Sequence, residues 1–154
     1  MSPLGFHFEW RNLNVNRGND VSVELAVITV KGHCDIAGLS NRSQVEGSLG
    51  FTHLSDGQIL PFTEINCDRV RHFVQGELLA MPADDREYAF GRALGRVLAH
   101  ELYHIFANTT RHGSGVAKES YTVHDLVCDD FLFQQRESQI LRSRVPAVPP
   151  PPAL

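Results

Sequence analysis

The segment His100-Glu101-Leu102-Tyr103-His104 constrains this chain more than any other feature, because it combines a metal-binding pattern with a helical spacing. Two histidines four residues apart lie on one face of a helix, so both imidazoles can reach one ion at about 2.0–2.1 Å. The glutamate between them can hold a water whose pKa zinc lowers to about 7, and can accept its proton. The pattern therefore predicts zinc-dependent hydrolysis, most often of a peptide bond, with His100 and His104 as ligands and Glu101 as general base.

The residues around the motif predict one long helix over 84–108. Asp84 and Glu87, which follow Pro82, have the spacing of a capping box at a helix start. A loop rich in Thr and Gly over 109–122 ends the pattern. Apolar side chains recur between these limits every three or four residues, as on the buried face of a helix: Phe90, Leu94, Val97, Leu98, Leu102 and Ile105.

A catalytic zinc ion needs a third protein ligand, and the chain after the motif offers the candidates. His112 is the only histidine within 109–122, and the glycines beside it allow the chain to turn back tightly. We therefore expect His112 to be the third ligand. Glu119, His124 and Asp125 are the alternatives, although capping a helix is a competing role for His124 or Asp125.

Length and composition are those of one soluble globular domain. The chain has 154 residues, of which 42% are hydrophobic and 21% charged. Its net charge of −4 gives no electrostatic footprint for nucleic acid or an anionic membrane. No apolar run approaches the roughly 20 residues that span a bilayer, and residues 1–10 have neither the basic start nor the apolar core expected of a secretory signal. We expect a monomer whose partner is a peptide or protein substrate.

Three cysteines, Cys34, Cys67 and Cys128, lie far apart without a CxxC pattern. This arrangement is not a disulfide framework, so we expect free thiols in a reducing compartment and a cytoplasmic location. One bridge with a single remaining thiol is the alternative.

Four segments have the pattern of strands. Alternating aromatic residues over 5–10 indicate a short half-buried strand, and the nearly continuous apolar run over 21–30 indicates a central one. An Asp-Gly turn between 49–53 and 58–65 predicts a hairpin. Pro61 would make the second of these strands an edge strand, because proline cannot donate to a ladder.

Two further helices are expected, over 68–79 with Asp68 as its cap, and over 125–141. The domain would then occupy 1–144. The proline-rich residues 145–154 are expected to form an extended, solvated tail.

The helical motif followed by His112 resembles the zincin metallopeptidases, and most closely their metzincin branch. The metzincin pattern HExxHxxGxxH places a glycine three residues after the second histidine and the third ligand six after it. Here those positions hold Ala107 and Thr110, and the next histidine comes two residues later. Metzincins also carry a methionine in a turn under the metal. This chain has none after Met81, and 116–121 would be the equivalent stretch.

The resemblance implies an α+β fold in which a small mixed sheet packs on the active-site helix and an exposed antiparallel edge strand binds extended peptide. That strand would include Ile59, Leu60 and Phe62, unless it is an ordinary edge strand without a ligand. Tyr121 could stabilise a developing oxyanion, unless it only packs in its loop. Zincins often begin with a strand and a helix that are not seen here, which suggests a minimal version.

The resemblance thus implies a zinc metallopeptidase. The alternative is a non-catalytic metal-binding or peptide-binding domain with the same fold. A zinc ion with four protein ligands would indicate this alternative, because catalysis needs an open position on the metal.

Overall fold

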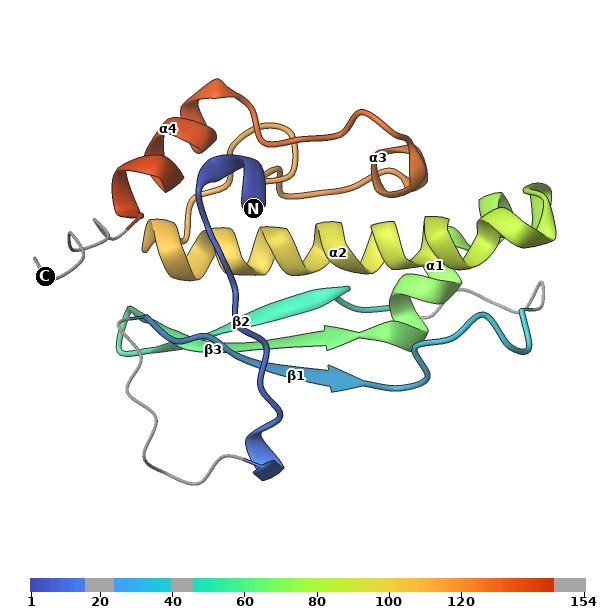
Figure 1. Cartoon of the computed structure of the whole chain (residues 1–154), viewed down its shortest axis with the longest axis horizontal. Coiled ribbons are helices and arrows are strands. Elements are labelled where there is room, and N and C mark those ends of the chain that lie inside the picture. The colour runs from blue at the N-terminus through green and yellow to red at the C-terminus, as the bar shows by residue number, and fades with distance from the viewer. Residues whose placement is uncertain (16–23, 40–45, 146–154) are drawn as a thin grey trace, which may run out of the picture.

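The computed structural model describes residues 1–15, 24–39 and 46–145, which form an α+β fold. A three-stranded mixed sheet lies along one side of the long helix α2, and α3 and α4 lie on its other side (Figure 1). The elements in chain order are η1 (Ser2–Leu4), η2 (Leu13–Val15), β1 (Val27–Lys31), β2 (Gly50–Ser55), β3 (Gln58–Asn66), α1 (Cys67–Ala80), α2 (Ala83–Ala107), α3 (Val123–Val127) and α4 (Gln135–Arg144).

The sheet has the order β1-β3-β2, with β3 parallel to β1 and antiparallel to β2. The predicted hairpin is confirmed: Asp56 and Gly57 join β2 to β3 with φ of 50° and 76°, the positive values that a tight hairpin turn requires. The predicted strand positions are wrong, because β3 is central and β1 lies at an edge. Val30 of β1 is 57% exposed, so its apolar run does not indicate burial on both faces.

Pro61 lies in the central strand at a place where pairing is interrupted. The register with β2 shifts between the pair Thr52–Thr63 and the pair Leu54–Ile59, so three residues of β3 centred on Pro61 oppose one residue of β2. The ladder to β1 begins only after the proline. A bulge is one of the few sites where a sheet tolerates proline, which is why this residue did not mark an edge.

The two central helices occupy the predicted segments but begin differently. The Asn66 side chain, rather than Asp68, caps α1 by accepting the Arg69 N–H at 3.0 Å. Pro82 occupies the N-cap of α2 without a side-chain hydrogen bond, so the expected capping box is not formed there. Helix α2 ends at Ala107, and its C-cap Asn108 adopts the left-handed conformation with φ of 47°.

The single helix expected over 125–141 is two helices, α3 and α4. Thr122 and Asp125 form a capping box at the start of α3. The Arg96 guanidinium of α2 then donates to the backbone oxygens of Leu126, Cys128 and Asp129 at 2.9, 2.6 and 3.1 Å. These bonds satisfy the backbone oxygens that a longer helix would have bonded to its next turn. Helix α3 can therefore end at Val127, although apolar residues continue along the chain after it.

Residues 5–10 do not form the expected strand. Leu4 and Phe6 are buried, and the Phe6 and Phe8 rings lie 5.1 and 5.8 Å from that of Phe106 near the end of α2. The alternating aromatic residues therefore pack the first residues of the chain against α2 and do not form a strand. Of the predicted strand over 21–30, residues 21–23 lie outside the described part, as does the predicted tail after residue 145.

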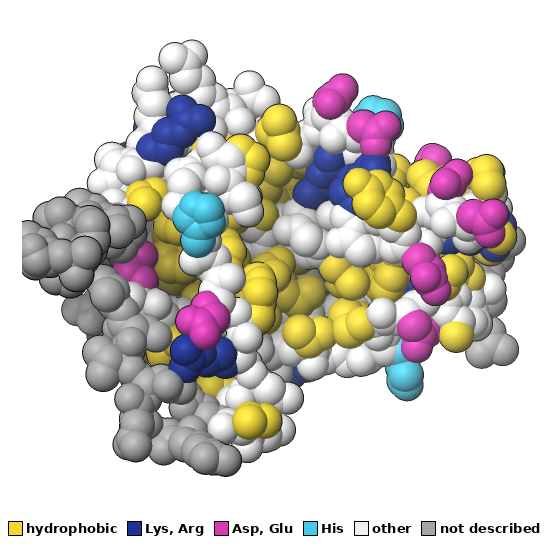
Figure 2. All heavy atoms as spheres, in the orientation of Figure 1, with side chains coloured by type: hydrophobic (Ala, Val, Ile, Leu, Met, Phe, Trp, Pro, Cys, Tyr) yellow, Lys and Arg dark blue, Asp and Glu magenta, His cyan; other side chains and the backbone are white. Residues whose placement is uncertain are grey.

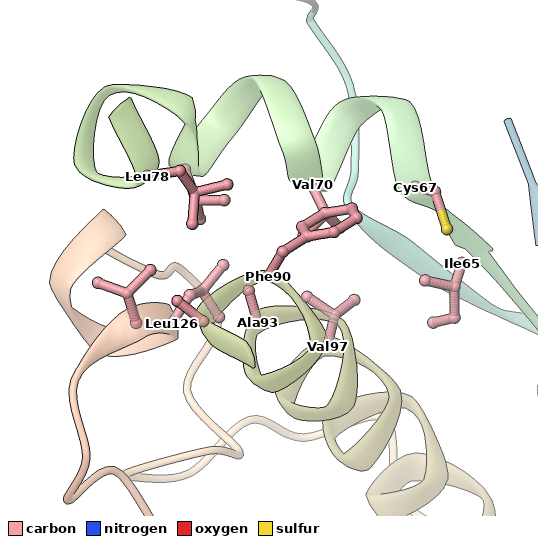
Figure 3. Packing of buried hydrophobic residues seen from close by; sticks show 11 residues of the cluster. Ile65, Cys67, Val70, Leu78, Phe90, Ala93, Val97 and Leu126 are labelled. Atoms are coloured by element: carbon pink, nitrogen blue, oxygen red, sulfur yellow. The ribbon is translucent and has the colours of Figure 1, made fainter. Parts of the chain in front are cut away.

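The main core lies between α1, α2 and the sheet. Figure 3 shows Val70 and Leu78 of α1 facing Phe90 and Ala93 of α2, with Leu126 of α3 beside them. Hydrophobic side chains reach the surface in a band at the level of α2 and the sheet (Figure 2). This core fixes α2 against the sheet and so fixes the residues of the motif.

Cys34 and Cys67 form a disulfide, and Cys128 is a free thiol. The expectation of three free thiols is therefore wrong, and the alternative of one bridge is confirmed. Because such bonds are typical of oxidising compartments, the basis for a cytoplasmic location is lost. No helix in the described part of the chain is long and apolar enough to span a membrane.

Candidate metal centre

Three histidines meet at the end of α2. His100 and His104 project from the helix and His112 comes from the loop that follows, and one ring nitrogen from each lies within 4.8 Å of the others. The Nε2 atoms of His100 and His104 are 3.1 Å apart. Two nitrogens bound to one tetrahedral zinc at about 2.0–2.1 Å would be about 3.3 Å apart, so the pair fits a shared ion.

Backbone carbonyls orient the two helical histidines. His100 Nδ1 lies 2.9 Å from the Val116 oxygen, and His104 Nδ1 lies 2.7 Å from the Thr109 oxygen. A carbonyl can only accept, so each Nδ1 carries the proton and each Nε2 presents a lone pair to the site. Burial, with smaller contributions from the neighbouring histidines, lowers the pKa of His100 to about 4, which keeps this ring neutral and able to ligate at neutral pH.

The loop carrying His112 is fixed by its contacts with the segment before α4. Val116 N–H donates to the Leu132 oxygen at 3.2 Å, and Gly115 has φ of 60°. A Cβ on Gly115 would lie 2.0 Å from the Leu132 oxygen, so only glycine fits. The turn brings the His112 ring within 5.3 and 5.0 Å of the His100 and His104 rings.

Glu101 is buried and lines the same cavity as the three histidines. Thr52 of β2 donates its hydroxyl to Glu101 Oε2 at 2.6 Å. Burial raises the pKa of Glu101, while the bond from Thr52 opposes that rise. Sequence reasoning missed Thr52, because one threonine within a strand pattern carries no signal until the strand is placed against α2.

The cavity has a volume of about 500 Å³ and lies between β2 and the loop after α2. A Cβ on Gly50 would lie 2.8 Å from Glu101 Oε1 and 2.9 Å from Val97 Cγ1, so this glycine lets β2 approach the helix. Sequence reasoning missed this contact too. Apolar side chains supply much of the wall: Leu49, Phe51, Leu54, Ile59, Phe73 and Val97.

The other candidate ligands lie outside the histidine group that the described residues form. Glu119 lines the cavity as an exposed side chain. His124 and Asp125 belong to α3, where the Asp125 carboxylate accepts from Thr122 and pairs with Lys118.

Tyr121 also lines the cavity, with its ring 5.6 Å from that of His100. Its hydroxyl donates to the Val116 oxygen, the same atom that orients His100. Burial raises the pKa of Tyr121, so the phenol stays protonated. The observed contact is therefore with the backbone that supports His100.

The expected substrate strand is not an edge strand. Ile59, Leu60 and Phe62 belong to β3, the centre of the sheet, and only Ile59 of the three lines the cavity. Strand β2 forms the sheet edge beside the cavity instead. The expectation assigned the edge to the wrong strand of the hairpin, because it took Pro61 as an edge signal.

Comparisons with known proteins found no matching family model, no matching curated protein and no matching solved structure. The function is therefore inferred from the geometry of the site alone.

Proposed function

We propose that this chain is a zinc-dependent metallopeptidase. The observation that carries the proposal is the meeting of three histidine nitrogens within 4.8 Å beside a buried glutamate in one cavity. Three neutral imidazoles are a ligand set of catalytic zinc sites, which keep a fourth position open. A zinc ion held there would supply a Lewis acid and would lower the pKa of a water molecule to about 7.

Glu101 is the general base in this proposal. Its elevated pKa brings the carboxylate closer to the operating pH, where a base is both ionised and strong enough to accept a proton. Thr52 fixes one carboxylate oxygen, so the second remains for the attacking water. Nothing in the packing of α2 requires a carboxylate at this buried position, which favours a chemical role.

An extended peptide is the substrate that suits the cavity. Among the described residues no strand pairs with the outer edge of β2 beside the cavity, and a peptide can add to such an edge through main-chain hydrogen bonds. The apolar wall around Leu49, Phe73 and Val97 favours an apolar side chain next to the scissile bond.

Glu101→Gln tests the proposal, because the amide has nearly the same size but cannot accept the proton. We expect the purified wild-type chain to bind about one zinc ion and to cleave a reduced, unfolded protein. The variant should keep the zinc, measured by elemental analysis, and lose at least about 100-fold in hydrolysis rate. The His100→Ala, His104→Ala double variant is the metal-free control. Zinc uptake without hydrolysis in the wild type would favour the non-catalytic alternative.

A further inference from the structure

Glu137, at the start of α4, is 3% exposed, although carboxylates are almost never fully buried without a partner. Its Oε1 accepts a long hydrogen bond of 3.4 Å from the Ser114 N–H. Its Oε2 is shielded from solvent and has no hydrogen-bond partner among the described residues. Burial of an unpaired carboxylate oxygen costs free energy, so the stability of the fold does not explain a glutamate here.

The carboxylate of Glu137 lies against the backbone that carries His112. A Cβ on Gly113 would lie only 2.2 Å from Glu137 Oε1, so the carboxylate packs directly on the residue after the histidine. His112 and Glu137 also line a second cavity, of about 460 Å³, between the end of α2 and α4. His112 and Thr109 belong to the walls of both cavities, so their loop separates the two.

His112 lacks the kind of support that its two neighbours have. Carbonyl oxygens hold the Nδ1 atoms of His100 and His104, whereas no hydrogen bond holds the exposed His112 ring within the described residues. The orientation of this ring therefore depends on its backbone. Within the loop, the Gly113 N–H donates to the Ala117 oxygen at 2.8 Å and the Ala117 N–H donates to the Ser114 oxygen at 3.2 Å. Glu137 adds a contact from α4 to the two residues that follow His112.

We propose that Glu137 is a positioning residue for the metal centre, an inference that rests on the proposed zinc site. It fixes Gly113 and Ser114 so that the His112 ring is directed toward His100 and His104. Groups that orient metal ligands commonly change metal affinity by about 10–100-fold when they are removed.

Glu137→Met separates positioning from stability, because methionine fills a similar volume and has no buried carboxylate. We expect the metal-free variant to melt at the wild-type temperature or above it, since a buried unpaired oxygen is removed. We expect its cobalt(II) affinity, measured by visible absorption, to fall by at least about tenfold. Glu137→Gln, which keeps an acceptor for Ser114, should recover most of the loss. Gln139→Met, which introduces the same methionine at an exposed position of α4, should leave both values unchanged.

A double-mutant cycle with His112→Ala completes the test. In that background Glu137→Met should change cobalt affinity by less than about twofold, because the group that Glu137 positions is gone. Wild-type cobalt affinity in the single Glu137→Met variant would overturn the inference and leave the proposed function intact. A methionine variant that fails to fold would also overturn it, because Glu137 would then be a structural residue. Wild-type protein that takes up no cobalt would overturn the proposed function and this inference together.

Discussion

At the scale of single residues, the site separates into groups that sequence reasoning can find and groups that it cannot. His100, Glu101 and His104 are joined by local helix geometry, so their spacing alone predicts a shared face. His112 could be proposed because it is the only histidine in the loop over 109–122. Thr52 contacts Glu101 across 49 residues of sequence, and no local pattern encodes such a contact.

The third ligand gives the sharpest residue-scale prediction. We expect His112→Ala to weaken zinc binding at least about tenfold, because two imidazoles cannot complete a catalytic site. Glu119→Ala is the matched control, since its side chain lines the same cavity outside the histidine group. Competition with a chromogenic chelator near neutral pH measures both affinities. Loss of zinc by Glu119→Ala and its retention by His112→Ala would assign the third ligand to a carboxylate.

At the scale of elements, the sequence predicted those that depend on local pattern and misplaced those that depend on distant partners. Helix α2 and the β2–β3 hairpin occupy the expected segments, because periodicity and an Asp-Gly turn are local signals. The order of the strands depends on which strands pair with β3. Pro61 wrongly indicated an edge strand, because a bulge accommodates the proline in the central strand. The break between α3 and α4 depends on Arg96, some 30 residues earlier.

Gly50 tests the contact between β2 and α2. In Gly50→Ala the new Cβ would lie 2.8 Å from Glu101 Oε1 and 2.9 Å from Val97 Cγ1, so the strand or these two buried side chains must shift. We expect a loss of about 1–3 kcal/mol in the free energy of unfolding, measured by urea denaturation, together with a lower rate of hydrolysis.

Gly91→Ala is the matched control for Gly50→Ala. Gly91 lies on an exposed face of α2, and a Cβ there would meet nothing within 4 Å. Alanine should stabilise the helix by about 0.5–1 kcal/mol and leave hydrolysis unchanged. Equal destabilisation by the two variants would show that close packing at Gly50 is not the cause.

At the scale of the whole molecule, the main core fixes α2 against the sheet, and a disulfide ties a further segment to that core. Cys67 is the first residue of α1, and it is 1% exposed in the core that α1 shares with α2. Its bridge to Cys34 joins the segment after β1 to that core across 33 residues of sequence. The sequence could not predict this pairing, because cysteine spacing alone does not determine which thiols meet.

Removal of the bridge should therefore lower stability more than it changes the site. Closure of a loop of this length by a disulfide is worth about 3–4 kcal/mol in the chain-entropy model, so Cys34→Ser, Cys67→Ser should melt roughly 10 °C below the oxidised wild type. Neither cysteine lines the cavity, so the variant should still bind zinc at 25 °C. Cys128→Ser is the control and should melt within about 1 °C of the wild type, since its thiol takes part in no disulfide and serine keeps a polar atom beside Arg96. Calorimetry with and without a reductant checks the result: a wild-type melting temperature that a reductant leaves unchanged would mean that the bridge adds nothing to the stability of the folded chain.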